Sequence, residues 1–119
     1  MPAGALEGRE PAVKGVDRPD GGVVVHLAGE LDLYNAHEVR EALLTCCAEE
    51  PGRLVVDLSE VRFVDSTVLG VLIEARSRFP EKQAFLLASP GVETRRALEI
   101  SGLDHHFNIH ASVDEALAS

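Results

Sequence analysis

The fold of this chain is decided by residues 53–78, RLVVDLSEVRFVDSTVLGVLIEARSR, in which an apolar strand precedes an apolar helix. Branched apolar residues dominate Arg53–Leu58, which is typical of a buried strand. From Ser66 to about Arg78, apolar side chains would lie on most sides of a helix. A helix of that kind has to pack between a sheet and other elements. The segment therefore predicts one strand-helix unit of a layered fold.

The same alternation of strands and helices extends to both sides of this unit. We expect further strands at 11–16, 23–28, 83–88 and 106–109, and further helices at 36–48, 90–100 and 112–117. The resulting order is β-β-α-β-α-β-α-β-α. Strands separated by single helices imply a mixed, mostly parallel sheet, and the initial hairpin adds one antiparallel edge. The sequence therefore predicts a single α/β domain.

Local signals predict where two of these helices begin. Asn35 is a favourable cap, and Glu38 three residues later gives a capping-box pattern. Ser89 followed by Pro90 fits a cap with proline at the first helical position. The helix that follows is expected to run to about Ile100. Its partly inward residues are predicted to be Val92, Leu98 and Ile100.

Composition and charge exclude several classes of function. The 119 residues include 20 acidic and 11 basic side chains, a net charge of −9, which disfavours nucleic acid and anionic membranes as partners. The apolar runs are too short to cross a bilayer, and the start lacks a secretory signal. We expect residues 1–10 to be a flexible tail and residues 11–119 to form the domain, located in the cytoplasm.

The two cysteines, Cys46 and Cys47, are neighbours on a predicted helix. Adjacent helical residues point in different directions, so a disulfide between them would be strained. We expect both to be small core residues in a reducing compartment.

Two segments follow neighbouring strands at the same edge of the predicted sheet, which is where open α/β sheets bind ligands and partners. They are Gly29–Tyr34 and Phe63–Thr67. If the two strands are adjacent and parallel, Asp32 and Ser66 lie close together. Ser66 at the start of a helix has two readings: an N-cap hydroxyl, or an exposed phosphate acceptor at the positive end of the helix dipole.

The residues around Ser66 leave similar alternatives open. Asp65 fits a second cap or a group that orients the Ser66 hydroxyl. Thr67 fits a second acceptor or a hydroxyl that completes the cap.

Three histidines, His105, His106 and His110, cluster near the last strand. Adjacent strand residues point to opposite faces of a sheet, so His105 and His106 could not easily bind the same metal ion. We therefore expect solvated histidines and no metal or cofactor.

Several segments together resemble the anti-sigma factor antagonists of the STAS domain family. They are Gly29-Glu-Leu-Asp32, Val64-Asp-Ser-Thr67, the following Leu69-Gly-Val-Leu72, and Ser101-Gly-Leu103. The resemblance covers about residues 12–118. The family's fold, a small mixed sheet with helices packed mainly on one side, agrees with the predicted order of elements.

The resemblance implies a bacterial protein–protein switch in transcription regulation, and not an enzyme. In the family, the unphosphorylated antagonist binds an anti-sigma factor that is also a serine kinase, and a sigma factor is released. The kinase supplies ATP and Mg²⁺ and phosphorylates the serine after the motif aspartate, which is Ser66 here; a serine phosphatase reverses the step. The resemblance implies a partner-binding surface of Glu30, Asp32, Asp65, Ser66 and Thr67.

One departure from the family pattern is Val68, where members commonly carry glycine. A β-branched residue is acceptable there if its backbone is helical, and unfavourable if a positive φ is required. The departure bears on the identity of the kinase or the efficiency of phosphorylation, and not on the fold.

Three alternative functions differ in how well the sequence fits them. A STAS module that serves a stress-sensing complex or a transport ATPase, with no sigma factor, would share the fold. A response-regulator receiver domain is more distant: Asp57 lies on a strand, but the acidic pair after the first strand is missing and Lys82 precedes its strand. A serine hydrolase is disfavoured because Ser66 lacks the glycine-rich nucleophile elbow.

Overall fold

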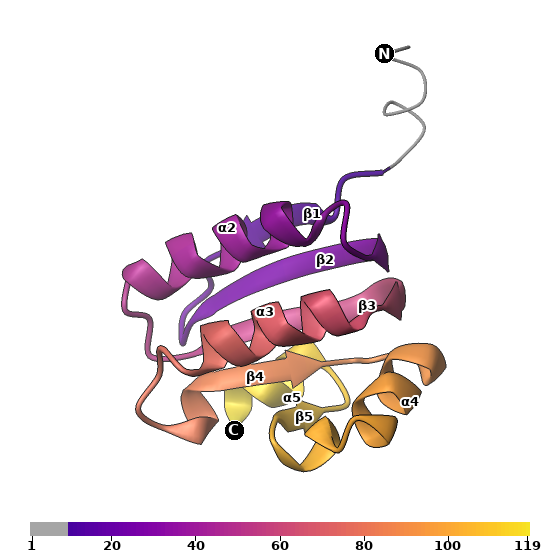
Figure 1. The fold of residues 1–119 in the computed structure, drawn as a ribbon. Coiled ribbons are helices and arrows are strands. Elements are labelled where there is room, and N and C mark those ends of the chain that lie inside the picture. Colours follow the sequence, from indigo (N-terminus) through magenta and orange to yellow (C-terminus); the bar gives the residue numbers. More distant parts are fainter. Residues whose placement is uncertain (1–9) are drawn as a thin grey trace.

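The computed structural model describes residues 10–119, which form one five-stranded sheet with helices on both faces (Figure 1). The strands are β1 (Val13–Asp17), β2 (Val23–Leu31), β3 (Leu54–Val64), β4 (Phe85–Ala88) and β5 (Asn108–His110). The helices are α2 (Ala36–Ala48), α3 (Ser66–Arg76), α4 (Val92–Ile100) and α5 (Val113–Ala118), with 3₁₀ turns at Lys82–Ala84 and Leu103–His105. The predicted tail at residues 1–10 lies, except for Glu10, outside the described residues.

The strands lie in the sheet in the order β1-β2-β3-β4-β5. The β1 strand is antiparallel to β2, and every other neighbouring pair is parallel. This confirms the predicted element order and the mixed, mostly parallel sheet. No helix within residues 10–119 is long and apolar enough to span a bilayer.

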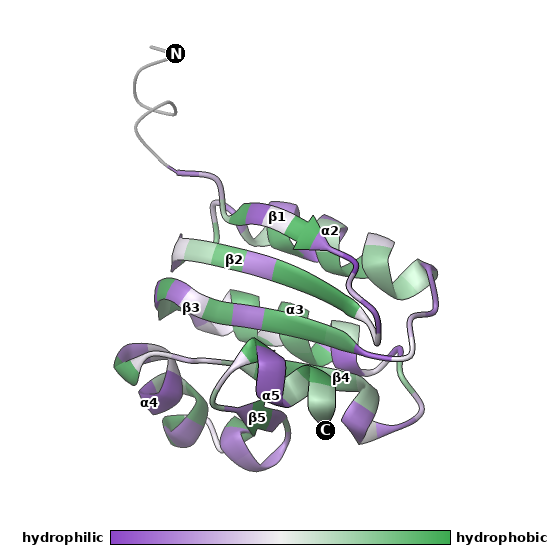
Figure 2. Cartoon of the chain, turned by 180° about the vertical axis from the view of Figure 1, so that it is seen from behind, coloured by the Kyte–Doolittle hydropathy of each residue, from purple (hydrophilic) through white to green (hydrophobic). Residues whose placement is uncertain are grey.

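The two faces of the sheet bury different side chains. Alternate strand residues such as Val25, Val56 and Leu87 join the main core with the apolar sides of α2, α3 and α4. The intervening residues, including Val55 and Leu86, form a smaller core under α5. Figure 2 shows this second face, where none of the helices within residues 10–119 covers β1, β2 or most of β3. The helices therefore pack mainly on one side, as expected.

Two strands are longer than their sequence patterns predicted. The β2 strand continues past Ala28 to Leu31, and β3 continues past Leu58 to Val64. Their pairing contains irregularities at two points, between His26 and Ala28 and again after Gly29, which let both strands continue beyond the polar Ser59-Glu60 step. The extension matters because it carries the loops after β2 and β3 beyond the end of β4.

The predicted start of α4 is wrong. Ser89 is not its cap: it has φ +56 and its Oγ donates to the Ala111 carbonyl at 3.0 Å, while the helix begins at Val92 with Gly91 as N-cap. Of the residues predicted to face inward, only Leu98 is buried; Val92 is 74% and Ile100 81% exposed. Ser89 is bonded through its N–H to the His110 carbonyl and through its Oγ to the Ala111 carbonyl at the end of β5, so it continues the strand contact and the helix begins three residues later.

Candidate functional site

The loops that follow β2 and β3 meet at one edge of the sheet. Leu31 and Val64, the last residues of the two strands, are register partners. The backbone N–H of Asp65 donates to the Leu31 carbonyl at 3.0 Å. The two strands are adjacent and parallel, which is the arrangement under which the Asp32 and Ser66 segments were expected to lie close together. We call the residues Glu30–Asn35 and Phe63–Thr67 the rim.

The loop after β2 is held by its own side chains. Asn35 Oδ1 accepts from the Asp32 N–H at 2.8 Å, and Asn35 Nδ2 donates to the Glu30 carbonyl at 2.8 Å. Asp32 Oδ1 accepts from the Tyr34 N–H at 3.0 Å. These bonds clamp the loop in an Asx-type turn directly before α2.

The capping box predicted for α2 is wrong. Asn35 is the N-cap residue, but its side chain makes no cap hydrogen bond because it is engaged with Asp32 and Glu30. Glu38 does not return to the cap either, since its Oε2 accepts from the Val13 N–H of β1 at 2.9 Å. The loop and the edge strand therefore use the side chains that would otherwise close the helix end.

The α3 helix begins at Ser66, and Asp65 is its cap. Asp65 has an extended backbone and its Oδ1 accepts from the Val68 N–H at 3.1 Å. Of the two readings of Ser66, the N-cap role thus belongs to Asp65. Ser66 and Thr67 occupy the first turn and both side chains are exposed. Ser66 is thus an exposed residue at the positive end of an eleven-residue helix.

Val68, the departure from the family pattern, fits α3 without strain. It lies within the helix and is fully buried in the main core. Among the described residues only Glu50 and Ser89 combine a side chain with a positive φ, so Val68 has an ordinary backbone. Val68 is therefore part of the core, whereas Ser66 two residues earlier is exposed.

The rim also exposes large apolar side chains that sequence reasoning missed. Leu33 is 70% and Tyr34 86% exposed, and Phe63 on β3 is 45% exposed. A signal was present, because Leu33 and Tyr34 stand in a loop segment between two elements, where polar residues are usual. Glu30 is exposed beside them, and Asp32 and Asp65 are half-buried.

The profile of the STAS domain matches residues 10–116. The chain belongs to the STAS domain family.

The relatives of this STAS domain include anti-sigma factor antagonists. It is 33% identical over 98 residues to the anti-sigma-F factor antagonist RsfB of Mycobacterium tuberculosis, covering 82% of this chain and 80% of that protein. It is 40% identical over 81 residues to an anti-sigma-B factor antagonist of Listeria monocytogenes, covering 66% and 70%. The crystal structure of an anti-sigma factor antagonist from Mycobacterium paratuberculosis superimposes with a TM-score of 0.83 at 31% identity, covering 92% and 95%. The match to the STAS domain excludes the alternative that this chain has the fold of a response-regulator receiver domain.

A second polar cluster of the STAS domain lies away from the rim, on the face that α2 and α3 do not cover. His26 Nδ1 lies 2.7 Å from Asp57 Oδ2, and His26 Nε2 lies 2.8 Å from Asp17 Oδ2. Burial alone would lower the pKa of His26, but the hydrogen bonds to Asp57 and Asp17 outweigh it and raise that pKa. Burial likewise opposes ionisation of Asp57, yet hydrogen bonds from His26 and Ser59 lower its pKa. Asp57 is thus a structural partner of His26, seven residues before the end of β3.

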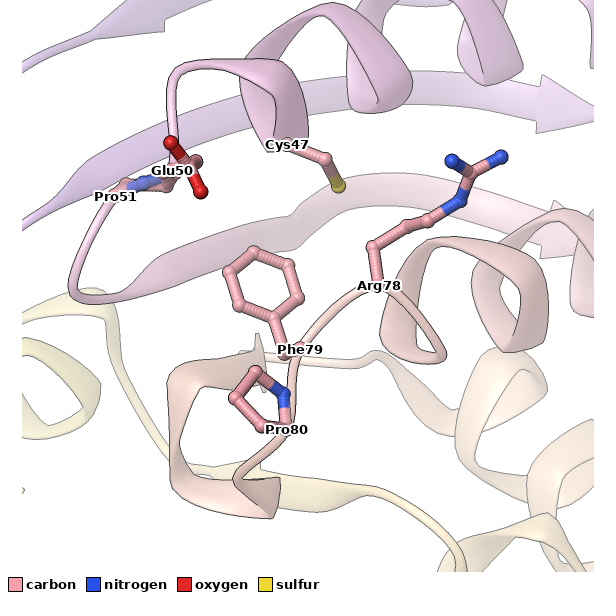
Figure 3. A pocket seen from close by; sticks show the side chains of 6 residues that line it. All are labelled: Cys47, Glu50, Pro51, Arg78, Phe79 and Pro80. Atoms are coloured by element: carbon pink, nitrogen blue, oxygen red, sulfur yellow. The ribbon is translucent and has the colours of Figure 1, made fainter.

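A small cavity of about 190 Å³ opens at the opposite end of the STAS domain, between the ends of α2 and α3 (Figure 3). Its lining residues are Cys47, Glu50, Pro51, Arg78, Phe79 and Pro80. Burial raises the pKa of the Cys47 thiol, which disfavours the reactive thiolate. Cys46 is buried in the main core and Cys47 packs against it, and both are free thiols, as predicted.

Proposed function

We propose that this STAS domain is an anti-sigma factor antagonist whose unphosphorylated form binds an anti-sigma factor serine kinase through the rim and thereby releases a sigma factor. The observation that carries the proposal is the exposed Ser66 at the first residue of α3, beside the loop that contains Asp32. The named relatives support the same role. Glu30, Asp32, Asp65 and Thr67 complete the docking surface.

Phosphorylation of Ser66 is the step that ends binding. The Ser66 Oγ attacks the γ-phosphorus of ATP held with Mg²⁺ by the kinase. An Oγ–P bond forms, the bond from the γ-phosphorus to ADP breaks, and the hydroxyl proton passes to a base of the kinase. This chain supplies only the acceptor hydroxyl, so it is a substrate and a ligand, while the catalytic groups and the nucleotide belong to the partner.

The charge of the phosphate explains why binding would be lost. Transfer requires the reacting atoms to approach to about 3–3.5 Å, so the new phosphate faces the phosphates of ADP. It adds about −1.5 to −2 charges and stands beside the Asp65 carboxylate. Repulsion from the nucleotide then separates the two proteins, while the buried face of α3 is unaffected. A serine phosphatase restores the hydroxyl. We expect this cycle to run in the cytoplasm, with neither nucleic acid nor membrane as a partner.

The test is phosphorylation by each purified anti-sigma factor kinase of the source organism with Mg-ATP. We expect one phosphate, mapped to Ser66 by peptide mass spectrometry, and none in Ser66→Ala. Ser66→Ala should bind the kinase with ADP as the wild type does, and Ser66→Asp should bind weakly. Ser77→Ala is the matched control, because Ser77 is exposed at the other end of α3 with its Oγ bonded to the Glu74 carbonyl at 2.6 Å.

Two results would contradict the proposal. A phosphate on Thr67 would move the acceptor by one residue, and tight binding by Ser66→Asp would remove the switch. A wild-type chain that binds none of the kinases but assembles with a large sensing complex or a transporter would favour the alternative STAS role without a sigma factor.

A further inference from the structure

The loop after β2 presents two large apolar side chains to solvent without using them in the core. Leu33 is 70% and Tyr34 86% exposed, although Leu31 before them and Ala36 after them are buried. We propose that Leu33 and Tyr34 form an apolar anchor that inserts into an apolar pocket of the anti-sigma partner, with lysine or arginine side chains bordering that pocket. This inference rests on the proposed function and names what its docking surface recognises.

The anchor is held in its exposed position before any partner binds. The side-chain amide of Asn35 bonds to the backbone on both sides of Leu31: it donates to the Glu30 carbonyl and accepts from the Asp32 N–H, each at 2.8 Å. The Asp32 carboxylate accepts from the Tyr34 N–H, and the Asn35 N–H donates to the Asp32 carbonyl at 3.2 Å. A loop fixed in this way loses little conformational entropy on binding, so the apolar contact area is converted efficiently into affinity.

The position of the anchor joins it to the phosphate acceptor. The Asp65 N–H bonds to the Leu31 carbonyl, which places the first residues of both loops side by side. Leu33 lies two residues beyond Leu31, and Ser66 follows Asp65 directly. A partner that holds Ser66 at its nucleotide therefore covers the Leu33–Tyr34 loop in the same encounter.

The charge around the anchor defines the chemistry of the partner surface. Glu30 precedes the loop and Asp32 lies in it, while Asp65 donates its N–H to the carbonyl of Leu31 just before the loop. Two arginines on the elements that flank the rim already face carboxylates of this chain: Arg62 Nη1 lies 3.4 Å from Glu10 Oε1, and Arg40 Nη2 lies 2.7 Å from Glu74 Oε2. The rim is thus an acidic border around an apolar centre, and its complement is an apolar pocket with a basic border. Apolar anchors at the centre of an interface control dissociation, whereas border charges control association.

The test measures binding of the partner kinase in the Ser66→Ala background with Mg-ADP, so that phosphorylation does not intervene. The probe is the purified anti-sigma factor kinase of the source organism that binds the wild type. We expect the double variant Leu33→Ser, Tyr34→Ser to bind about tenfold more weakly or worse, through faster dissociation. The conservative pair Leu33→Met, Tyr34→Phe should retain wild-type affinity, and added salt should slow association only.

The matched control is Val92→Ser, Ile100→Ser on α4, which removes two apolar side chains of similar exposure from outside the rim. Its affinity should stay within about twofold of the wild type, and thermal melts of all variants should coincide, because surface changes of this kind leave the core intact. Unchanged affinity of the Leu33–Tyr34 variant overturns the anchor and leaves the proposed function standing. An equal loss in the control overturns it too, and a wild type that binds no kinase overturns both proposals.

Discussion

Two glycines in the segments that form the site differ in what a side chain would meet there. Gly29 in β2 has φ +82, and an added Cβ would lie 2.6 Å from Glu10 Oε1. Gly70 lies in α3, and an added Cβ would meet nothing within 4 Å. The first glycine is therefore required by the bulged end of β2, whereas the second only lowers the intrinsic stability of a helix.

These environments predict opposite effects of the same substitution. Gly29→Ala should lower the free energy of unfolding by about 1–3 kcal/mol, because a non-glycine residue in a left-handed conformation is strained. Gly70→Ala should raise it by about 0.5–1 kcal/mol, because alanine is the better helix former. Urea unfolding of the two variants measures both changes. Effects of the same sign would show that the φ of Gly29 is not what constrains it.

At the scale of elements, one histidine links three strands. His26 on β2 lies between Asp57 on β3 and Asp17 on β1, on the face of the sheet where no helix of the described part of the chain lies over β1 and β2 (Figure 2). The β2 strand is thus joined to its antiparallel neighbour β1 and to its parallel neighbour β3 by side-chain contacts of His26 as well as by backbone hydrogen bonds. The cluster takes the place of the apolar packing that a helix would provide on that face.

This cluster predicts a pH dependence of stability. The pKa of His26 is raised in the folded state, so its contribution is fully present below the ordinary value of 6.5 and is lost as the pH rises through the raised value. The free energy of unfolding should therefore fall from pH 6.5 upward in the wild type, and less in His26→Gln. The lowered pKa of Asp57 acts on the acid side, where its contribution is lost as the pH falls through that lowered value.

Urea unfolding between pH 5.5 and pH 9 measures how the free energy of unfolding of the wild type and of His26→Gln changes with pH. Steps of roughly one pH unit are sufficient, because a single site titrates over about two pH units. His37→Gln is the control, since His37 is exposed on α2 beside Glu41 and links no strands. The same slope in His26→Gln as in the wild type would mean that the three-strand cluster does not couple to folding.

At the scale of the whole molecule, the sheet separates a large core from a small one. The small core consists of Val24, Val55, Leu86, Ala88 and Ala116, and α5 covers it (Figure 2). Ser112 starts this six-residue helix, with its Oγ accepting from the Glu115 N–H at 3.0 Å. So short a helix is marginal by itself and depends on its packing against β3, β4 and β5.

A charge placed in the small core tests how much α5 contributes. Ala116→Asp should lower the free energy of unfolding by about 2 kcal/mol or more, because Ala116 is fully buried and a carboxylate there has no partner. Ala118→Asp adds the same charge at an exposed position of the helix and should change it by less than about 0.5 kcal/mol. Thermal or urea unfolding compares the two. Equal losses would mean that the charge, and not the burial, is responsible.

The order of the elements and the place of Ser66 are predictable from local sequence patterns alone. Apolar periodicity and β-branched runs are local properties, so the predicted helix at 36–48 has the observed bounds and most other ends shift by a residue or two. The place of Ser66 at the start of α3 follows from the same local pattern. Burial of Val68 and Cys46 also follows from it, because a helix on a sheet must bury its apolar side.

The hydrogen-bond partners of the polar side chains, in contrast, depend on how the elements pack together in three dimensions. Asn35 and Glu38 looked like a capping box, but the strand β1 and the Glu30 carbonyl compete for them. His26 finds its carboxylates 9 and 31 residues away, which depends on strand order and register. The exposure of Leu33 and Tyr34 likewise follows from the turn that Asn35 closes. Apolar burial is encoded along the chain, whereas each hydrogen-bond partner is chosen only after the strands have aligned.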